Sequence, residues 1–284
     1  MHSIFWFRTR QWVLSRVLHL TEHKKQTLLA APDAVLLLPA LFRKRRISRI
    51  LLVTTPGFVR RGTLTSLLDG CKKENISVTI FSEIAPDPQI ESVEQGFRLY
   101  QQIQAQAILA IGGGSVLDTA KLIGARVCCP KKTVPAMRGL LKVRRKLPPL
   151  FAVPTTAGTG SEVTPYAILT NHEKQTKKSI AAPCLFPTYA LLDAKYTKNL
   201  GLATTVNTAI DSLSHSVEGM MSKRANIMAD VIAKEAVKII ASTFDDLISG
   251  ELTEDDREKL LYASMLGGVV ISQTKTTAVH AMGY

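Results

Sequence analysis

In the first two thirds of the chain, short continuous apolar runs alternate with segments whose apolar residues recur at helical spacing. The apolar runs lie at residues 49–54, 77–81, 107–111 and 148–154. The helical segments lie at residues 62–75 and 89–104 and from residue 115 onward. Such runs are typical of strands that a parallel sheet buries on both faces. Their alternation with helices predicts an α/β fold with a doubly wound, Rossmann-like parallel sheet, which binds ligands at the carboxyl ends of its strands.

The pattern changes in the last third of the chain. Residues 179–182 and 190–193 are further candidate strands, and no convincing strand follows residue 195. Helical periodicity then covers residues 204–221, 227–247 and 254–273. We therefore expect two domains, an α/β domain at residues 1–194 and an all-helical domain at residues 195–284. Residues 1–20 also look helical, as a terminal helix covering the domain, an amphipathic segment at a membrane surface or a transit-like segment.

Charge narrows the partners that the chain can have. The 284 residues are 46% hydrophobic and 21% charged, and their formal net charge is +13. This excess of basic residues is typical of a protein that binds an anionic small ligand and has a solvated basic surface. The alternative is a protein that binds nucleic acid through the basic runs at 42–49 and 142–146. Because neither run interleaves aromatic with basic residues, we expect no nucleic-acid partner.

Cysteine usage and hydropathy bear on the compartment. The four cysteines form no Cys-x-x-Cys pair, which indicates reduced thiols and predicts a cytoplasmic protein. The longest apolar stretch is interrupted by Pro32, Asp33 and Pro39, and no run approaches the ~18 apolar residues of a membrane span. We therefore expect no stable insertion into a membrane.

A glycine turn ends the run at 107–111. Gly112, Gly113 and Gly114 follow the predicted strand, and Ser115 opens a helix. Without Cβ atoms the backbone approaches an anion closely, and free N–H groups at the helix start point at it. The spacing is neither a GxGxxG nor a P-loop, because Asp118 stands near the place of a third glycine. The turn therefore indicates a phosphate site or a glycine-rich turn without a ligand.

A second loop of small residues follows the run at 148–154. Thr155, Thr156, Thr159 and Ser161 supply hydroxyl groups on a backbone that contains two glycines. Such a loop suits the oxygens of a ribose or a phosphate, and the alternative is an ordinary polar turn.

Asp211 and His215 are four residues apart in a predicted helix, so they share one helix face. Both side chains can reach one divalent cation, and His280 is a candidate ligand from a separate helix. The alternative is a hydrogen-bonded pair without a metal. Imidazole and carboxylate groups suit both Fe(II) and Zn(II), and the sequence does not separate these two ions.

Together these motifs resemble those of the iron-containing (group III) alcohol dehydrogenases, from about residue 49 to the last residue. The matching segments are residues 86–88, 112–121, 154–162, Asp193 within Leu-Leu-Asp-Ala, 211–215 with Glu218, and 279–281. The resemblance implies a dinucleotide-binding α/β domain, a helical domain of the dehydroquinate synthase-like type, and a cofactor between them. It implies a metal-dependent alcohol dehydrogenase or aldehyde reductase, in which hydride passes between NAD or NADP and a small alcohol or aldehyde. A homodimer is compatible with it.

The resemblance also assigns roles to individual residues. Asp211, His215 and His280 match three metal ligands at the catalytic centre, which would hold Fe(II) or alternatively Zn(II). The implied cofactor-binding residues are Thr55, Gly112, Gly113, Gly114, Ser115, Asp118, Thr155, Thr156 and Thr159. A metal at that centre acts as a Lewis acid on the substrate oxygen.

Three departures from the family pattern change these expectations. Thr55, in a predicted turn at residues 55–57, replaces the family's usual aspartate, and Arg60 and Arg61 follow it. The absence of a carboxylate and the nearby cations favour NADP over NAD. Tyr284 stands where the family often has a histidine near the nicotinamide.

The third departure is that a further histidine ligand and several helices of the family lie downstream of Tyr284. We therefore expect an incomplete helical domain with exposed apolar surface. The alternative function is a catalytically inactive dinucleotide-binding fragment that lacks a complete metal site.

Overall fold

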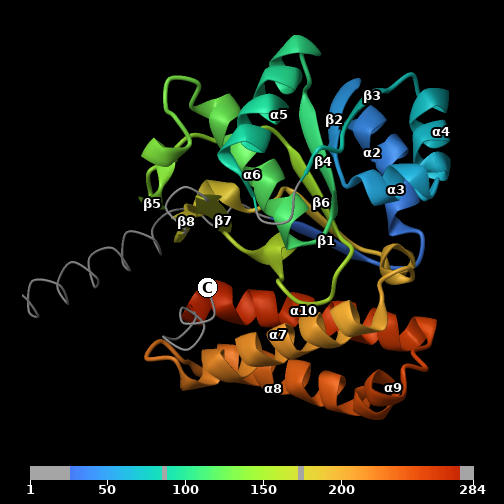
Figure 1. Cartoon of the computed structure of the whole chain (residues 1–284), viewed down its shortest axis with the longest axis vertical. Coiled ribbons are helices and arrows are strands. Elements are labelled where there is room, and N and C mark those ends of the chain that lie inside the picture. The colour runs from blue at the N-terminus through green and yellow to red at the C-terminus, as the bar shows by residue number, and fades with distance from the viewer. Residues whose placement is uncertain (1–25, 85–87, 172–175, 276–284) are drawn as a thin grey trace, which may run out of the picture.

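A computed structural model describes residues 26–84, 88–171 and 176–275 of the chain (Figure 1). Six parallel strands form a central sheet with helices on both faces, and a layer of helices lies beyond one end of the strands (Figure 1). In spatial order the strands are β1 (Thr27–Ala30), β9 (Tyr189–Leu192), β6 (Leu150–Pro154), β4 (Ala107–Gly112), β2 (Arg49–Val53) and β3 (Ser77–Phe81). The predicted α/β fold with a parallel sheet is confirmed.

Side chains that alternate along each strand divide the sheet between two apolar cores. In β4, Ile108 and Ala110 face one core, and Leu109 and Ile111 face the other. The helices of the first core are α5 (Ile90–Gln102) and α6 (Gly114–Cys128), and those of the second are α2 (Leu38–Lys44), α3 (Pro56–Arg60) and α4 (Thr65–Lys73). Burial on both faces explains why these strands are continuously apolar.

A smaller sheet packs against α6. Its strands, in spatial order, are β5 (Gly139–Leu140), β8 (Thr176–Ala181) and β7 (Tyr166–Asn171). Ala167 and Leu169 of β7 and Ile180 of β8 belong to the same core as the inner face of α6. This sheet therefore fixes the residues that precede β7 alongside the first turns of α6.

Two predicted helices have different boundaries in the structure. The helix predicted at 62–75 is confined to α4, because Gly62 and Asn75 have positive φ angles of 67° and 56°. The helix predicted at 227–247 is divided into α8 (Ile227–Ser242) and α9 (Phe244–Ser249). The division falls at Thr243, whose hydroxyl donates to the Ile240 carbonyl at 3.0 Å and competes with the regular helical bonding.

The turn predicted at residues 55–57 is wrong, since α3 starts there with Pro56 at its first position, where a missing N–H group costs nothing. The sequence pattern also misses β1 and β7, and the strand predicted at 179–182 is β8 of the smaller sheet. The basic run at residues 142–146 follows a short 3-10 helix, η2 (Pro135–Met137), and β5.

The layer of helices consists of α7 (Leu202–Met221), α8, α9 and α10 (Glu254–Thr274). α10 contacts β9 and the 3-10 helices η3 (Ser161–Val163) and η5 (Ala194–Thr197). α10 approaches the loop after β6 closely because two glycines face each other there. A Cβ atom on Gly160 would lie 2.5 Å from the Gly268 Cα. α10 therefore lies directly on the loop that follows β6. The division of the chain at residue 194 stays a prediction.

Several large apolar side chains on the helical layer are exposed. The exposed fractions reach 75% for Met221, 81% for Ile227 and 69% for Ile248. The sequence predicts exposed apolar surface on this part of the chain. Of the helices that the structure describes, none is both long enough and apolar enough to cross a membrane. The helix predicted at residues 1–20 lies outside the described residues.

Glu162 is buried where η3 meets α10, with 1% of its surface exposed. Its carbonyl accepts a hydrogen bond from the Gln26 side chain at 2.7 Å. Burial raises the pKa of its carboxyl group from 4.5 to about 7, against the weaker opposing effects of a backbone hydrogen bond and the Lys121 ammonium. The folded chain therefore holds a proton at Glu162 over a pH range in which the unfolded chain has released it.

We expect the free energy of unfolding to fall as the pH rises from 4.5 to about 7. In this window the native state binds more protons at Glu162 than the unfolded state does, so a rising pH favours unfolding. The loss is about 3 kcal/mol, because a tenfold change in proton affinity corresponds to about 1.4 kcal/mol.

Denaturant unfolding of the wild-type chain and of Glu162→Gln, measured from pH 4 to pH 8, checks this expectation. The Gln side chain has the shape of Glu but no titratable group, so the free energy of unfolding should fall less with rising pH in that variant. Asp245→Asn, which alters an exposed carboxyl group on α9, is the control. A fall that is equally large in Glu162→Gln and in the wild type would contradict the assignment.

Candidate functional site

The turn between β4 and α6 presents backbone rather than side chains. Gly113 is the N-cap of α6, and the first turn of α6 contains no acidic residue. A Cβ atom on Gly112 would lie 2.5 Å from the Val116 Cβ, so a side chain does not fit there. The helix start therefore keeps a positive potential and exposed N–H groups, which together suit a phosphate.

The loop after β6 packs directly on this turn. Cβ atoms on Gly113 and Gly114 would lie 3.1 Å from the Thr156 Cγ2 and 2.8 Å from the Thr159 Cγ2. The Thr155 N–H donates to the Gly112 carbonyl at 3.1 Å. Side chains at these two glycines would press against the threonines across from them, and the two loops form one continuous wall.

A cavity of about 530 Å³ opens beside this wall. Its volume lies within the range of roughly 300–1,000 Å³ that is usual for small-molecule sites. The lining comes from α6, the loop after β6, the smaller sheet, α7 and the end of α10. The cavity therefore joins the sheet region to the helical layer.

The structure brings six of the predicted site residues to this cavity. They are Gly114, Ser115, Asp118, Thr159, Asp211 and His215. Four others, Gly112, Gly113, Thr155 and Thr156, belong to the wall behind the lining. Thr55 follows β2, the strand beside β4, and His280 lies outside the described residues.

Asp211 and His215 lie one turn apart on α7, as their spacing predicts. The Asp211 Oδ1 is 3.7 Å from the His215 Nε2. The imidazole is 5% exposed and the carboxylate 36% exposed. Both residues line the cavity, and the two atoms are close enough to be ligands of one metal ion.

The described residues supply only part of the ligand set that a metal ion needs. Within the described ranges, no set of three or more His, Cys, Asp or Glu side chains is arranged to hold a metal ion. Asp211 and His215 supply two donors, and the predicted third, His280, lies outside those ranges. One imidazole nitrogen and one carboxylate oxygen are ligands that both Fe(II) and Zn(II) accept.

The polar contacts that hold the cavity wall are not evident from the sequence pattern. Lys121 of α6 is completely buried, and its ammonium donates to the Ser161 hydroxyl at 2.8 Å and to the Tyr166 carbonyl at 2.6 Å. These partners lie 40 and 45 residues further along the chain. Lys121 and Asp118, one turn apart in an otherwise apolar stretch of helix, are the local sign of such an arrangement.

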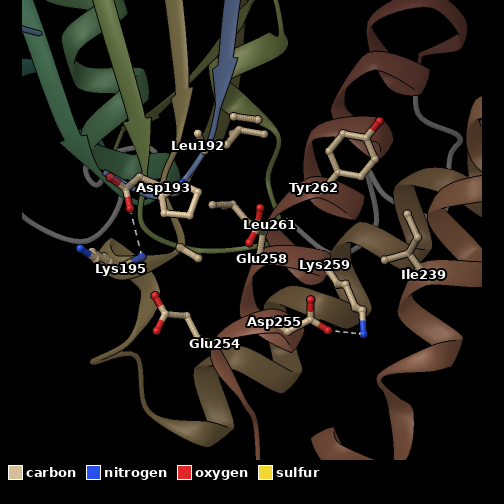
Figure 2. Close-up of a pocket in the computed structure, with 14 residues that line it drawn as sticks. Leu192, Asp193, Lys195, Ile239, Glu254, Asp255, Glu258, Lys259, Leu261 and Tyr262 are labelled. Carbon is tan, nitrogen blue, oxygen red and sulfur yellow. Dashed lines mark hydrogen bonds and ion pairs between the residues drawn. The ribbon is translucent and has the colours of Figure 1, made fainter. Parts of the chain in front are cut away.

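A second cavity, of about 260 Å³, lies between the ends of β1 and β9 and the start of α10 (Figure 2). Asp193 accepts hydrogen bonds there from the N–H groups of Val35 and Lys195, at 3.4 and 3.3 Å, and burial raises the pKa of its carboxyl group. Asp255 and Lys259 form an ion pair at 2.5 Å. Of the predicted site residues that the structure describes, none lines this cavity, so the larger cavity is the candidate site.

Comparisons with known proteins match both parts of the chain. Residues 26–194 match the family described as iron-containing alcohol dehydrogenase. Residues 205–284 match the C-terminal part of the Fe-containing alcohol dehydrogenase family. The two matches follow each other in chain order, and the cavity with Ser115 and His215 in its lining lies between the regions that they cover.

Individual relatives are longer than this chain. It is 31% identical to a choline dehydrogenase of Bacillus subtilis over 238 residues, which cover 83% of this chain and 59% of that protein. A crystal structure of 1,3-propanediol oxidoreductase superposes with a TM-score of 0.85 at 30% identity, covering 90% of this chain and 67% of the other.

A third likeness is to the sulfoacetaldehyde reductase of Bifidobacterium kashiwanohense in complex with NAD+. The TM-score is 0.82 at 27% identity, and the match covers 91% of this chain and 68% of the other. Family matches over both parts and the shared fold agree with the resemblance that the motifs indicate. The chain belongs to the iron-containing alcohol dehydrogenase family.

Proposed function

We propose that the chain binds a nicotinamide dinucleotide at the glycine turn and is part of an oxidoreductase that interconverts small alcohols and aldehydes. The observation that carries this proposal is a single cavity lined by Gly114 and Ser115 at the start of α6 and by Asp211 and His215 of α7. Hydride transfer requires cofactor and substrate to meet in one space, which this arrangement offers. The names of the choline dehydrogenase, 1,3-propanediol oxidoreductase and sulfoacetaldehyde reductase are compatible with this reaction class.

In this proposal the pyrophosphate lies at the start of α6. Backbone N–H groups of the first helical turn donate to it, and the absence of side chains at Gly113 and Gly114 permits a close approach. Thr159 presents a hydroxyl group in the lining beside the turn. The cofactor is thereby oriented by rigid backbone, which contributes to rate by holding the reactants in place.

The proposed metal ligands are Asp211, His215 and His280, for Fe(II) or alternatively Zn(II). When bound, the metal supplies Lewis acidity toward the substrate oxygen. The chain's own contribution is positional, because α7 holds the carboxylate and the imidazole on one face and packing around the ring of His215 limits its movement.

We also propose that the chain prefers NADP to NAD. Thr55 is the N-cap of α3 and carries no charge at the carboxyl end of β2. The Arg61 guanidinium lies over the Phe58 ring, 5.0 Å from its centroid, and Arg60 is exposed on the same short helix. Guanidinium groups without a competing carboxylate suit the additional phosphate of NADP.

A second candidate function is nucleotide binding without catalysis. The described residues contribute two of the three predicted metal ligands, and the chain spans 59% of the length of the B. subtilis relative. Nucleotide binding without metal retention or turnover by the 284-residue chain would favour this candidate.

Titration calorimetry with NADP+ and NAD+ tests the cofactor preference. The wild-type chain should bind NADP+ more tightly. Thr55→Asp should weaken NADP+ binding by about tenfold or more without weakening NAD+ binding, since a carboxylate there would repel the additional phosphate and compete for the arginines. Thr55→Asn is the matched control, because asparagine has the shape of aspartate without its charge. A wild-type preference for NAD+ would overturn this part of the proposal.

Metal retention tests the role of Asp211. Asp211→Asn should lower the affinity for Fe(II) or Zn(II) beyond the roughly 10- to 100-fold cost of losing a residue that merely supports a ligand. Nucleotide affinity should stay unchanged, because the start of α6 is intact. Competition with a chromophoric chelator measures the metal, and butanol oxidation with NADP+ measures turnover.

Asp245→Asn changes an exposed carboxyl group elsewhere on the helical layer and serves as the control. If Asp211→Asn and Asp245→Asn retain the same amount of metal, Asp211 is not a ligand.

A further inference from the structure

Two oppositely charged residues lie one turn apart on α6, directly after the glycine turn. Asp118 is 8% exposed and Lys121 is completely buried. The Lys121 Nζ is 3.6 Å from the Asp118 Oδ1, so the pair is close to neutral within an otherwise apolar stretch of helix. Lys121 does not line the cavity, so any effect that it has on the cavity acts through the residues to which its ammonium donates hydrogen bonds.

The Lys121 ammonium uses its three protons on one segment of the chain. It donates to the Ser161 hydroxyl at 2.8 Å, to the Tyr166 carbonyl at 2.6 Å and to the Thr164 carbonyl at 3.1 Å. The Thr164 hydroxyl is a further acceptor at 3.3 Å. The ammonium thus spans both ends of the segment 161–166, which leads from the loop after β6 into β7.

Asp118 completes the same arrangement from the preceding turn of α6. Its Oδ1 accepts from the Ser161 hydroxyl at 2.5 Å, and its Oδ2 accepts from the Ile168 N–H at 2.8 Å. Both carboxylate oxygens are therefore bonded to the wall segment. α6 carries the phosphate-binding turn at its start and holds the segment 161–168 one turn later.

The segment 161–166 also contacts the helical layer. The Tyr166 hydroxyl is 3.3 Å from the Ile271 carbonyl and 3.2 Å from the Ser272 carbonyl at the end of α10. Ser161, Thr164 and Tyr166 all line the cavity. The contacts of Lys121 consequently connect the glycine turn, through the cavity wall, to α10.

A lysine is a costly residue for a buried position if packing alone is required. Burial lowers the pKa of its ammonium, while the nearby carboxylates of Asp118 and Glu162 act in the opposite direction. Apolar residues of similar volume often replace buried ion pairs without loss of stability. What an apolar residue cannot supply here is a donor to three acceptors on one segment.

We propose that Lys121 is a positioning residue for the nucleotide cavity, because its ammonium fixes the segment 161–166 against α6 in the position in which Ser161, Thr164 and Tyr166 line the cavity. The inference rests on the proposed nucleotide binding for its functional consequence. Its structural part, that the segment loosens when the ammonium is removed, stands independently.

The test compares Lys121→Met with Leu122→Ala in the 284-residue chain. Met keeps most of the side-chain volume without donors, and Leu122 is a buried neighbour that belongs to the apolar core. Three quantities are measured for each variant: the free energy of unfolding, the Kd for NADP+ and NAD+, and amide hydrogen exchange of peptides that cover residues 159–168.

Lys121→Met should raise the Kd of the preferred nucleotide about tenfold or more and speed exchange in residues 159–168 at least fivefold. Leu122→Ala should leave both within about twofold of wild type, even where it lowers the free energy of unfolding as much. If Lys121→Met does not fold, Lys121→Gln takes its place, with the same direction and a smaller change expected. Equal effects of the Lys121 and Leu122 variants on Kd and exchange, or no effect of the Lys121 variant on either, would overturn the proposal.

If the wild-type chain binds neither nucleotide, the proposed function fails and the exchange data decide the positioning role. Faster exchange in residues 159–168 that is confined to the Lys121 variant would then still support it, and unchanged exchange would overturn it.

Discussion

The structure depends on the close approach of two loops at the carboxyl ends of β4 and β6. Gly113 and Gly114 have no side chains, and the methyl groups of Thr156 and Thr159 occupy the space that Cβ atoms would need. The same absence of side chains that lets the loops meet leaves the start of α6 open to an anion. The packing requirement and the proposed binding function therefore select the same residues.

Close contact continues from these loops to the helical layer. Gly160, with a φ of 58°, and Gly268 bring the loop after β6 and α10 together. Asp211 and His215 on the neighbouring helix α7 consequently line the same cavity as Ser115.

The sequence predicts those parts of the molecule whose structure depends on residues that are close together along the chain. The continuous apolar runs of β2 and β4 predict buried strands, and the spacing of Asp211 and His215 predicts a shared helix face. Helix ends were less predictable, since Asn75 ends α4 through a positive φ angle and Thr243 divides a helix through one hydroxyl group. The partners of Lys121 could not be predicted, because they are 40 to 45 residues distant and lie partly on β7, a strand without an evident pattern.

Amide hydrogen exchange of the 284-residue chain, with and without saturating NADP+, tests most directly whether a dinucleotide binds at the start of α6. Bound nucleotide should slow exchange in the first turn of α6, residues 114–118, and in the loop at residues 155–161, which together form the cavity wall. Protection confined to the smaller cavity around Asp193 and Tyr262 (Figure 2), with the start of α6 unchanged, would contradict this expectation.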